Sequence, residues 1–232
     1  MTITLYILAT IAILQGLISL IDGIRNMTYA LNYEHPEPPA GSVLVFCPAT
    51  GAETTLEENA RSLLAQTHPN YRVLFIVESE EDPAWAALSG IAGAELFVAG
   101  LATDSGQKVH NLSKAVRWAG SSADILVFSD SDTRFPKNWL RELIAPLSEG
   151  SVGASTGYRW YLAPNRRLNE LLRSAWNASV AGFLGPHQNN FVWGGSTAIR
   201  REVFDRACIL AAWKGAVSDD YALTEALRRA GL

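Results

Sequence analysis

Short apolar runs alternate with helical patterns through most of this chain, and no other feature constrains the fold as much. The runs are rich in β-branched residues and apolar on both faces, which is typical of strands buried in a parallel sheet. They cover residues 42–49, 71–79, 94–100, 124–130 and 152–158. Amphipathic patterns predict helices over residues 54–68, 106–120 and 137–150. We therefore expect an α/β domain whose mostly parallel sheet is flanked by helices. Thr54, followed by Glu57, forms a capping box that predicts where the first of these helices begins.

The N-terminus carries an uncharged apolar run from Ile3 to Ile21. As a helix it would be about 28 Å long, close to the hydrocarbon thickness of a bilayer. A cleaved signal peptide would have basic residues before the run and a small-residue cleavage site after it, and neither is present. A buried helix is the remaining alternative. We expect a transmembrane anchor over residues 1–24, a proline-rich linker over 25–41 and a domain over 42–232.

Charge and cysteine content bound the partners and the compartment. Arg25 follows the apolar run and no lysine or arginine precedes it, which favours a cytoplasmic location for the domain. The net charge of −4 and the lack of a basic stripe argue against nucleic-acid binding. Cys47 and Cys208 lie far apart in the sequence, and we expect both to be reduced, buried thiols.

Two aspartates, Asp130 and Asp132, end the apolar run at 124–130. In α/β sheets ligands bind at the carboxyl ends of the strands. Two carboxylates in a tight turn there can reach a hard cation such as Mg²⁺ or Mn²⁺ together with a ribose hydroxyl. The same D-x-D pattern also occurs in solvated turns. The chain has neither G-x-G-x-x-G nor a P-loop, so any nucleotide would bind by other means.

Further polar residues begin two of the helical patterns. Lys108 lies in the first turn of the pattern at 106–120, where a helix N-terminus and a cation favour a diphosphate. Asn111 follows one turn later and could bond to the turn that carries the carboxylates. Asp219 and Asp220 precede the last helical pattern. They could cap the helix, or one could face a cleft as a general base.

These segments together resemble a known enzyme family. The ordered set comprises "VLVFCPATGAETTLEENARSLLAQTHPNYRVLFIVESEEDPA", "KVHNL", "FSDSD", "GGSTAIRREVF" and "SDDYALT". It is similar to the ceramide glucosyltransferase branch of the inverting nucleotide-sugar glycosyltransferases over roughly residues 40–232. The resemblance implies a GT-A fold, a Rossmann-like domain with its active site at the strand ends, preceded by one transmembrane helix.

The resemblance also implies roles for single residues. The uracil and ribose would be held by Pro48, Thr50, Glu53 and Glu78, with Glu78 in place of the family's usual aspartate. Lys108 would contact the diphosphate. Asp130 would bond to the sugar or ribose and, with Asp132, would ligate the metal. Asp220 matches the general base, and Asp219 the acidic position before it.

The resemblance implies a membrane-anchored enzyme that moves a hexose from a nucleotide sugar, UDP-glucose or similar, to a membrane lipid such as ceramide. The resemblance also implies that this enzyme requires Mg²⁺ or Mn²⁺. Residues 158–185 combine arginines, aromatics and leucines, which fits a membrane interface or an ordinary helix packed on the sheet. The family's R-W motif is missing, so we expect the sequence to be a fragment truncated at its C-terminus. The alternatives are a polysaccharide synthase-like enzyme and a non-catalytic nucleotide-sugar-binding membrane protein.

Overall fold

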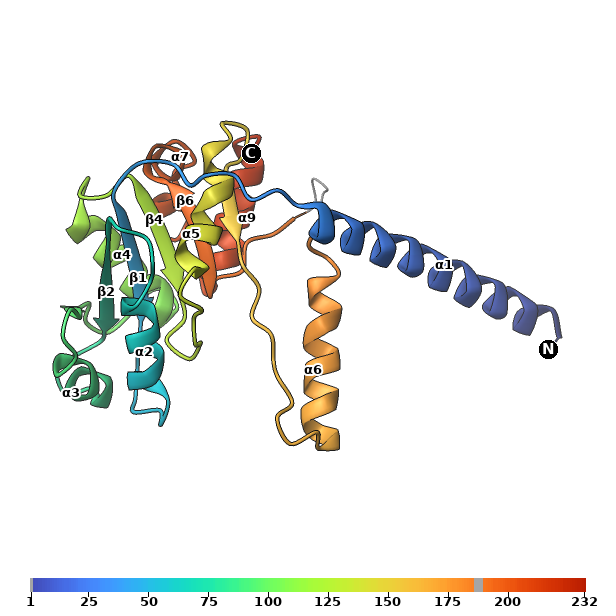
Figure 1. Cartoon of the computed structure of the whole chain (residues 1–232), viewed down its shortest axis with the longest axis horizontal. Helices are drawn as coiled ribbons and strands as arrows, with labels where there is room; N and C mark the ends of the chain where they lie inside the picture. Colours follow the sequence, from blue (N-terminus) through green and yellow to red (C-terminus); the bar gives the residue numbers. More distant parts are fainter. Residues whose placement is uncertain (1, 186–189) are drawn as a thin grey trace. The chain divides into compact units, whose positions relative to one another are not determined.

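A computed structural model of the chain describes residues 2–185 and 190–232. The chain divides into two compact units. One comprises Met1–Glu34 and Trp160–Asn190, and the other His35–Arg159 and Phe191–Leu232. The second unit holds the sheet and is described first (Figure 1).

The sheet has six strands in the order β3-β2-β1-β4-β6-β5. The strands are β1 (Val43–Pro48), β2 (Tyr71–Val77), β3 (Glu95–Val98), β4 (Ile125–Ser129), β5 (Ala154–Thr156) and β6 (Ser196–Arg200). The first four strands run parallel, while β6 pairs antiparallel with β4 and β5 pairs antiparallel with β6. The expected mostly parallel sheet is therefore present, with one reversed strand, β6, making antiparallel pairings at one edge.

Helices cover both faces of this sheet. They are α2 (Leu56–Leu64), α3 (Pro83–Ser89), α4 (Gln107–Ala119), α5 (Trp139–Ile144), the 3-10 helix η1 (Ala145–Ser148), α7 (Arg201–Arg206), α8 (Ile209–Ala212) and α9 (Asp219–Arg229). One core cluster joins Leu44 and Phe46 of β1 to α4 and to the C-terminal helices. The other joins Val43 and Val45 to α2, α3 and α5. Alternate residues of a strand thus serve opposite faces, which explains why these strands are apolar throughout.

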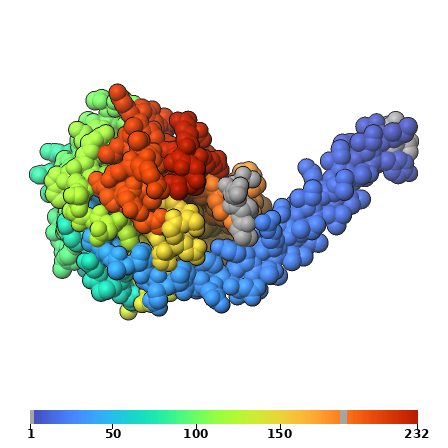
Figure 2. All heavy atoms as spheres, turned by 90° about the horizontal axis from the view of Figure 1, so that it is seen from above, coloured from blue at the N-terminus to red at the C-terminus, as the bar shows by residue number. Residues whose placement is uncertain are grey.

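Aromatic residues join β4 to the C-terminal helices. The Phe128 ring packs edge-on against Trp213 with centroids 5.4 Å apart, and Trp213 packs in the same way against Phe204 at 5.6 Å. The buried indole N–H of Trp213 donates a hydrogen bond of 3.0 Å to the carbonyl oxygen of Asp219. This bond holds the first turn of α9 against the core. The C-terminal residues that form α7, α8 and α9 lie together at the surface (Figure 2, orange to red).

Three expectations about local structure need correction. Helix α2 begins at Leu56 after Thr55, whose side chain makes no capping bond, so the capping box at Thr54 does not form. The run at 152–158 forms only the short edge strand β5, which runs in the same direction as β1–β4 but pairs antiparallel because its neighbour β6 is the reversed strand. Cys47 is buried as expected, but Cys208 is exposed; neither forms a disulfide.

The other unit contains two helices, α1 (Thr2–Asn32) and α6 (Leu168–Ala181). In the described residues α1 is the one helix long and apolar enough to cross a membrane, by length and composition. It continues past residue 24, into the segment expected to be a linker. The side-chain amide of Asn26 donates a hydrogen bond of 3.1 Å to the carbonyl of Gly182, next to the end of α6. The division into anchor, linker and domain remains a prediction.

Candidate functional site

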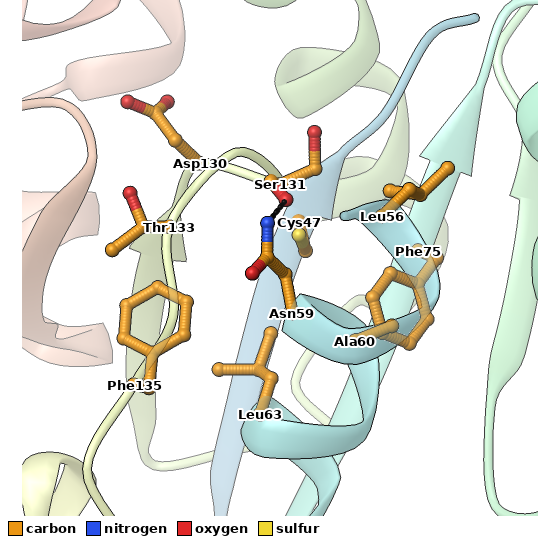
Figure 3. A pocket seen from close by; sticks show the side chains of 10 residues that line it. All are labelled: Cys47, Leu56, Asn59, Ala60, Leu63, Phe75, Asp130, Ser131, Thr133 and Phe135. Atoms are coloured by element: carbon orange, nitrogen blue, oxygen red, sulfur yellow. Dashed lines mark hydrogen bonds between the residues drawn. The ribbon is translucent and has the colours of Figure 1, made fainter. Parts of the chain in front are cut away.

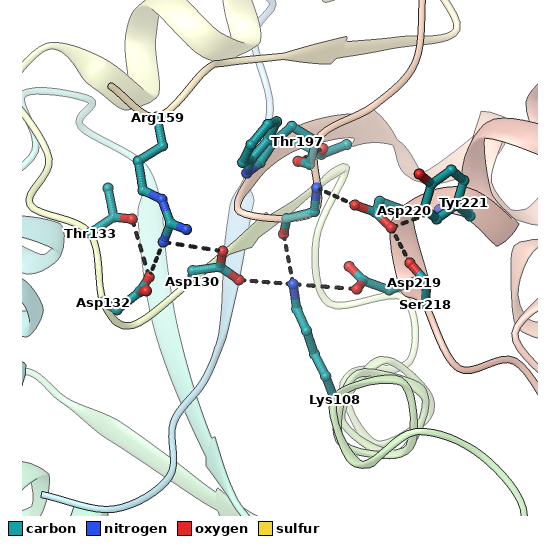
Figure 4. A network of polar contacts seen from close by, with 12 residues as sticks. Lys108, Asp130, Asp132, Thr133, Arg159, Thr197, Ser218, Asp219, Asp220 and Tyr221 are labelled. Carbon is teal, nitrogen blue, oxygen red and sulfur yellow. Dashed lines mark hydrogen bonds and ion pairs between the residues drawn. The ribbon is translucent and has the colours of Figure 1, made fainter. Parts of the chain in front are cut away.

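Polar residues gather where β1, β2 and β4 end and where β6 begins. The turn after β4 carries Asp130 and Asp132, and Pro48 ends β1. Because β6 runs antiparallel to β4, Gly194 and Gly195, which directly precede β6, lie at the same edge of the sheet. The edge is therefore supplied by segments far apart in the sequence (Figure 4).

Lys108, in the first turn of α4, lies at the centre of this edge. Its ammonium donates a hydrogen bond of 2.8 Å to Asp130 Oδ1 and one of 3.2 Å to the carbonyl of Gly194. A third interaction, an ion pair of 3.3 Å, joins it to Asp219 Oδ1 on α9. All three ammonium protons thus face protein oxygens, and direct contact with a diphosphate would require one of them to be exchanged.

Burial makes the pair of Lys108 and Asp219 mutually dependent. Burial raises the pKa of Asp219, and the neighbouring Lys108 charge offsets part of that rise. Burial alone would lower the pKa of Lys108, but the charges of Asp219 and Asp130 outweigh it and raise that pKa. The lysine is therefore charged, and we assign Asp219 as its ionised partner because an ion pair at 3.3 Å favours both charges.

Arg159 occupies the other side of the carboxylates. Its Nη1 lies 2.5 Å from Asp132 Oδ1 and 3.9 Å from Asp130 Oδ2. The site therefore combines two cations with the four carboxylates Asp130, Asp132, Asp219 and Asp220, which leaves two formal negative charges. Such a site favours a divalent cation and, without one, would repel a diphosphate.

Two glycines let the chain approach this cluster. A Cβ added at Gly195 would lie 2.4 Å from Asp130 Oδ2. One added at Gly194 would lie 2.7 Å from Asp219 Oδ2 and 3.1 Å from Lys108 Nζ. Gly194 and Gly195 are thus required by close packing against the carboxylates.

Asp220 lies in the first turn of α9. Its Oδ1 accepts hydrogen bonds from the Ser218 hydroxyl and from the amide of Tyr221, the latter at 2.8 Å. Its Oδ2 accepts a longer bond of 3.4 Å from the Gly194 amide. Ser218 occupies the N-cap position, and the Asp220 carboxylate contacts both the first turn of α9, through Tyr221, and the loop before β6, through Gly194.

A neighbouring hydrogen bond fixes the turn that carries the D-x-D pattern. The amide of Asn59 on α2 donates a bond of 3.1 Å to the carbonyl of Ser131, the residue between the two aspartates. Figure 3 shows this bond over the pocket between α2 and the turn, whose lining includes Cys47 and Phe135. Burial raises the pKa of the Cys47 thiol to about 12, so it stays protonated.

The first loop is held by a residue that sequence reasoning missed. The buried Asp82 accepts hydrogen bonds from the Thr50 hydroxyl at 2.9 Å and from the Gly51 amide at 2.8 Å. It also caps α3 by accepting a bond from the Ala84 amide. The signal was present, since an aspartate followed by proline is typical of a helix start.

The remaining expected residues lie at or near the same edge. Pro48 ends β1, Glu78 directly follows β2, and the exposed Glu53 lies in the loop before α2. Asn111, which was expected to bond to the D-x-D turn, instead accepts a hydrogen bond of 2.7 Å from Gln107. Arg159 and Asn59 were also missed, because no pattern in their own segments marks them.

Two solved structures are similar to this chain. A mannosyltransferase from Pyrobaculum calidifontis, in complex with GDP-Man and Mn²⁺, is 18% identical with a TM-score of 0.57, over 86% of this chain and 61% of that one. A glucosyl-3-phosphoglycerate synthase from Mycobacterium tuberculosis, in complex with phosphoglyceric acid, is 20% identical with a TM-score of 0.48, over 78% of this chain and 61% of that one. This chain thus spans about three-fifths of the length of either protein.

The likeness to the mannosyltransferase confirms the expected GT-A fold. Residues 4–232, nearly the whole chain, match the family described as Glycosyl transferase family 21. Enzymes of this kind transfer a sugar from an activated donor, which suits a charged strand edge built from carboxylates and a lysine. The chain belongs to glycosyl transferase family 21.

Proposed function

We propose that this chain is the catalytic part of a membrane-anchored inverting glycosyltransferase. It moves a hexose from a nucleotide sugar, UDP-glucose or similar, to a membrane lipid such as ceramide. The observation that carries this proposal is the connected network of Arg159, Asp130, Lys108 and Asp219, with Asp220 beside it, in a chain of glycosyl transferase family 21.

The carboxylates at this edge suit a divalent cation. Among the residues that the structure describes, no three His, Cys, Asp or Glu side chains form a metal cage by themselves. Mg²⁺ and Mn²⁺ commonly use one or two carboxylates together with substrate phosphates, and Asp132 with Asp130 supplies that number. The mannosyltransferase with this fold is described with Mn²⁺ and a sugar nucleotide. A bound cation would supply positive charge to the departing diphosphate.

The transfer itself requires a base and a leaving-group site on opposite sides of the sugar. We assign Asp220 as the base, with Oδ2 the accepting atom because its present hydrogen bond is long. As Asp220 takes the proton of the acceptor hydroxyl, the oxygen attacks the anomeric carbon and the bond to the diphosphate breaks. Attack from the face opposite the leaving group inverts the configuration, so no second carboxylate is needed as a nucleophile.

Donor recognition is assigned to the loops after β1 and β2. Thr50 lies in a loop that Asp82 holds in place, and Glu78 lies at the end of the neighbouring strand. With Pro48 and Glu53 these residues surround the place where the nucleoside would lie. Asp82 is a positioning residue here, since its oxygens face the protein.

A lipid acceptor follows from the membrane anchor. The run in α1 is apolar over enough residues to span a bilayer, and its exposed side chains include Leu5, Ile13 and Ile18. A tethered active site meets lipids at a far higher effective concentration than soluble acceptors. The positive-inside rule puts the catalytic unit in the cytoplasm.

The test is nucleotide-sugar binding by calorimetry on the full chain in lipid nanodiscs, with and without Mn²⁺. We expect Mn²⁺-dependent binding that is lost in Asp132→Ala. Asp205→Ala is the matched control. This exposed carboxylate forms an ion pair with Arg201 within α7, and α7 follows the end of β6 that is opposite to the site. Equal binding without metal, or no binding by folded protein, would contradict the assignment of the donor site.

A further inference from the structure

Helix α6 exposes a stripe of large apolar side chains, and its one buried side chain is the polar Asn177. The exposed apolar residues of α6 and the turn after it are Leu168, Leu171, Leu172, Trp176 and Phe183. Three of them recur at spacings of four residues, so they form one stripe along the helix. No α6 residue belongs to either core cluster in the described part of the chain.

The opposite face of α6 is the one that makes protein contacts. Asn177 is buried, and its side-chain oxygen accepts a hydrogen bond of 3.1 Å from the Tyr161 amide. The guanidinium of Arg173 lies 4.2 Å from the centroid of the Tyr161 ring. A water-facing surface helix has the reverse orientation, so the exposed apolar stripe requires an apolar partner.

Three observations indicate what that partner is. Residues 160–185 carry three arginines and one glutamate, a local positive charge in a chain whose net charge is −4. Trp176 lies on the apolar stripe, and tryptophan favours the boundary between lipid and water. The bond from Asn26 to Gly182 ties the end of α6 to α1 just beyond its apolar run, at headgroup depth if α1 spans the bilayer.

We propose that α6 is an interfacial helix that lies in the surface of an anionic bilayer. Its stripe enters the acyl boundary while Arg166 and Arg167, just before the helix, meet lipid phosphates. This inference rests on the proposed function in one respect, that α1 is the anchor. It adds a second membrane contact, which lies in the sequence between the D-x-D turn and β6.

The test measures the depth of spin labels in the full chain, reconstituted in vesicles of phosphatidylcholine and phosphatidylglycerol. Cys208→Ser removes the exposed native thiol, and Cys47 is buried. Labels are then attached in Leu172→Cys and Trp176→Cys on the stripe, in Leu14→Cys on α1, and in Ser121→Cys as the exposed control in the catalytic unit. Collision with oxygen reports lipid, and collision with a water-soluble nickel chelate reports water.

We expect the labels at positions 172 and 176 to collide with oxygen and to be shielded from nickel, at a shallower depth than the label at position 14. Nickel access equal to that at position 121 would overturn the interfacial assignment while leaving the anchor intact. Shielding from both reagents would overturn it in favour of a protein partner. Nickel access at position 14 would instead contradict the anchor of the proposed function.

A charge-reduced variant tests the choice of lipid. In Arg166→Gln with Arg167→Gln, the ratio of immersed to aqueous label on anionic vesicles should fall about fivefold for each arginine removed. On vesicles of phosphatidylcholine alone the ratio should not change. The matched control is Arg61→Gln with Arg134→Gln, two exposed arginines of the catalytic unit. An equal fall in the control, or none in the variant, would overturn the electrostatic part of the proposal.

Discussion

Lys108 holds together parts of the site that are far apart in the sequence. One ammonium joins the turn after β4, the loop before β6 and the first turn of α9, through Asp130, Gly194 and Asp219. Without it, the partly buried carboxylates would face one another with no cation between them. Removing one partner of such a pair is costly because the remaining charge stays desolvated.

We expect Lys108→Met to destabilise the chain by about 2 kcal/mol near neutral pH, a value at the low end because the lysine is about one-third exposed. The cost should shrink in acid. The pKa of Asp219 in the folded chain already lies above its value in the unfolded chain. The contribution of Asp219 to stability therefore falls as the pH rises from the unfolded pKa to the folded pKa. Losing Lys108 raises the folded pKa of Asp219 further, so the cost of the mutation grows with pH. Thermal unfolding in detergent at about pH 5 and about pH 7.5 measures the difference. Lys114→Met, on the exposed side of α4, is the control, and a pH-independent cost would contradict the pairing.

Arg159 competes with a cation for Asp132. Its guanidinium pairs with the carboxylate expected to ligate the metal. Arg159→Gln should therefore strengthen Mn²⁺ binding in the absence of donor, by about two- to fivefold, as suits a partly exposed pair. Electron paramagnetic resonance of free Mn²⁺ measures this directly. Arg159→Lys retains the charge and should bind Mn²⁺ nearly as the native chain does; unchanged or weaker binding in Arg159→Gln would show that the arginine does not oppose the metal.

At the scale of elements, the loop before β6 has to approach the carboxylates closely. Gly195→Ala would place a methyl group 2.4 Å from Asp130 Oδ2, so either the carboxylate or the strand must move. We expect a loss of about 1–3 kcal/mol in stability and a clear loss of Mn²⁺-dependent donor binding. Calorimetry and thermal unfolding of the same sample separate the two effects. Gly90→Ala, which meets no atom within 4 Å and has a φ of −83°, should change neither.

The strands and their common edge could be predicted because they depend on local patterns. Buried strands read as continuous apolar runs, and the rule that ligands bind at carboxyl ends indicated the edge that carries Asp130 and Asp132. The antiparallel pairing of β5 could not be predicted, since it depends on the reversed strand β6 lying between β4 and β5. Helix starts were also uncertain, because Thr55 and not Thr54 precedes α2 and Ser218 precedes α9.

Contacts between distant segments were the part that sequence reasoning could not supply. Arg159 reaches Asp132 across 27 residues, and Asn59 reaches Ser131 across 72. Neither residue belongs to a motif, so only the fold brings it to the site. Asp82 differs, because the Asp82–Pro83 pair carries a helix-start signal in the sequence, whereas the family resemblance indicated Glu78, the residue directly after β2.

At the scale of the whole molecule, the proposed membrane attachment and the proposed donor site fall in different units. Every residue of both core clusters belongs to His35–Arg159 or Phe191–Leu232, and so do the residues of the charged network. Burial of these clusters is the dominant favourable contribution to folding of that unit. The apolar run of α1 takes no part in it. Attachment and donor binding should therefore be separable by mutation.

Deletion of residues 1–34 tests this separation. We expect the shortened chain to unfold at nearly the same temperature and to bind nucleotide sugar with Mn²⁺ within about twofold of the full chain, because no core contact is removed. It should no longer resist extraction from membranes by alkaline carbonate, since the only helix of spanning length among the described residues is gone. A residual, salt-sensitive attraction to anionic vesicles should persist through α6 and its arginines. Loss of donor binding in a folded, shortened chain would show instead that the N-terminal helix contributes to the active site, and retained resistance to carbonate would show that α1 is not the anchor.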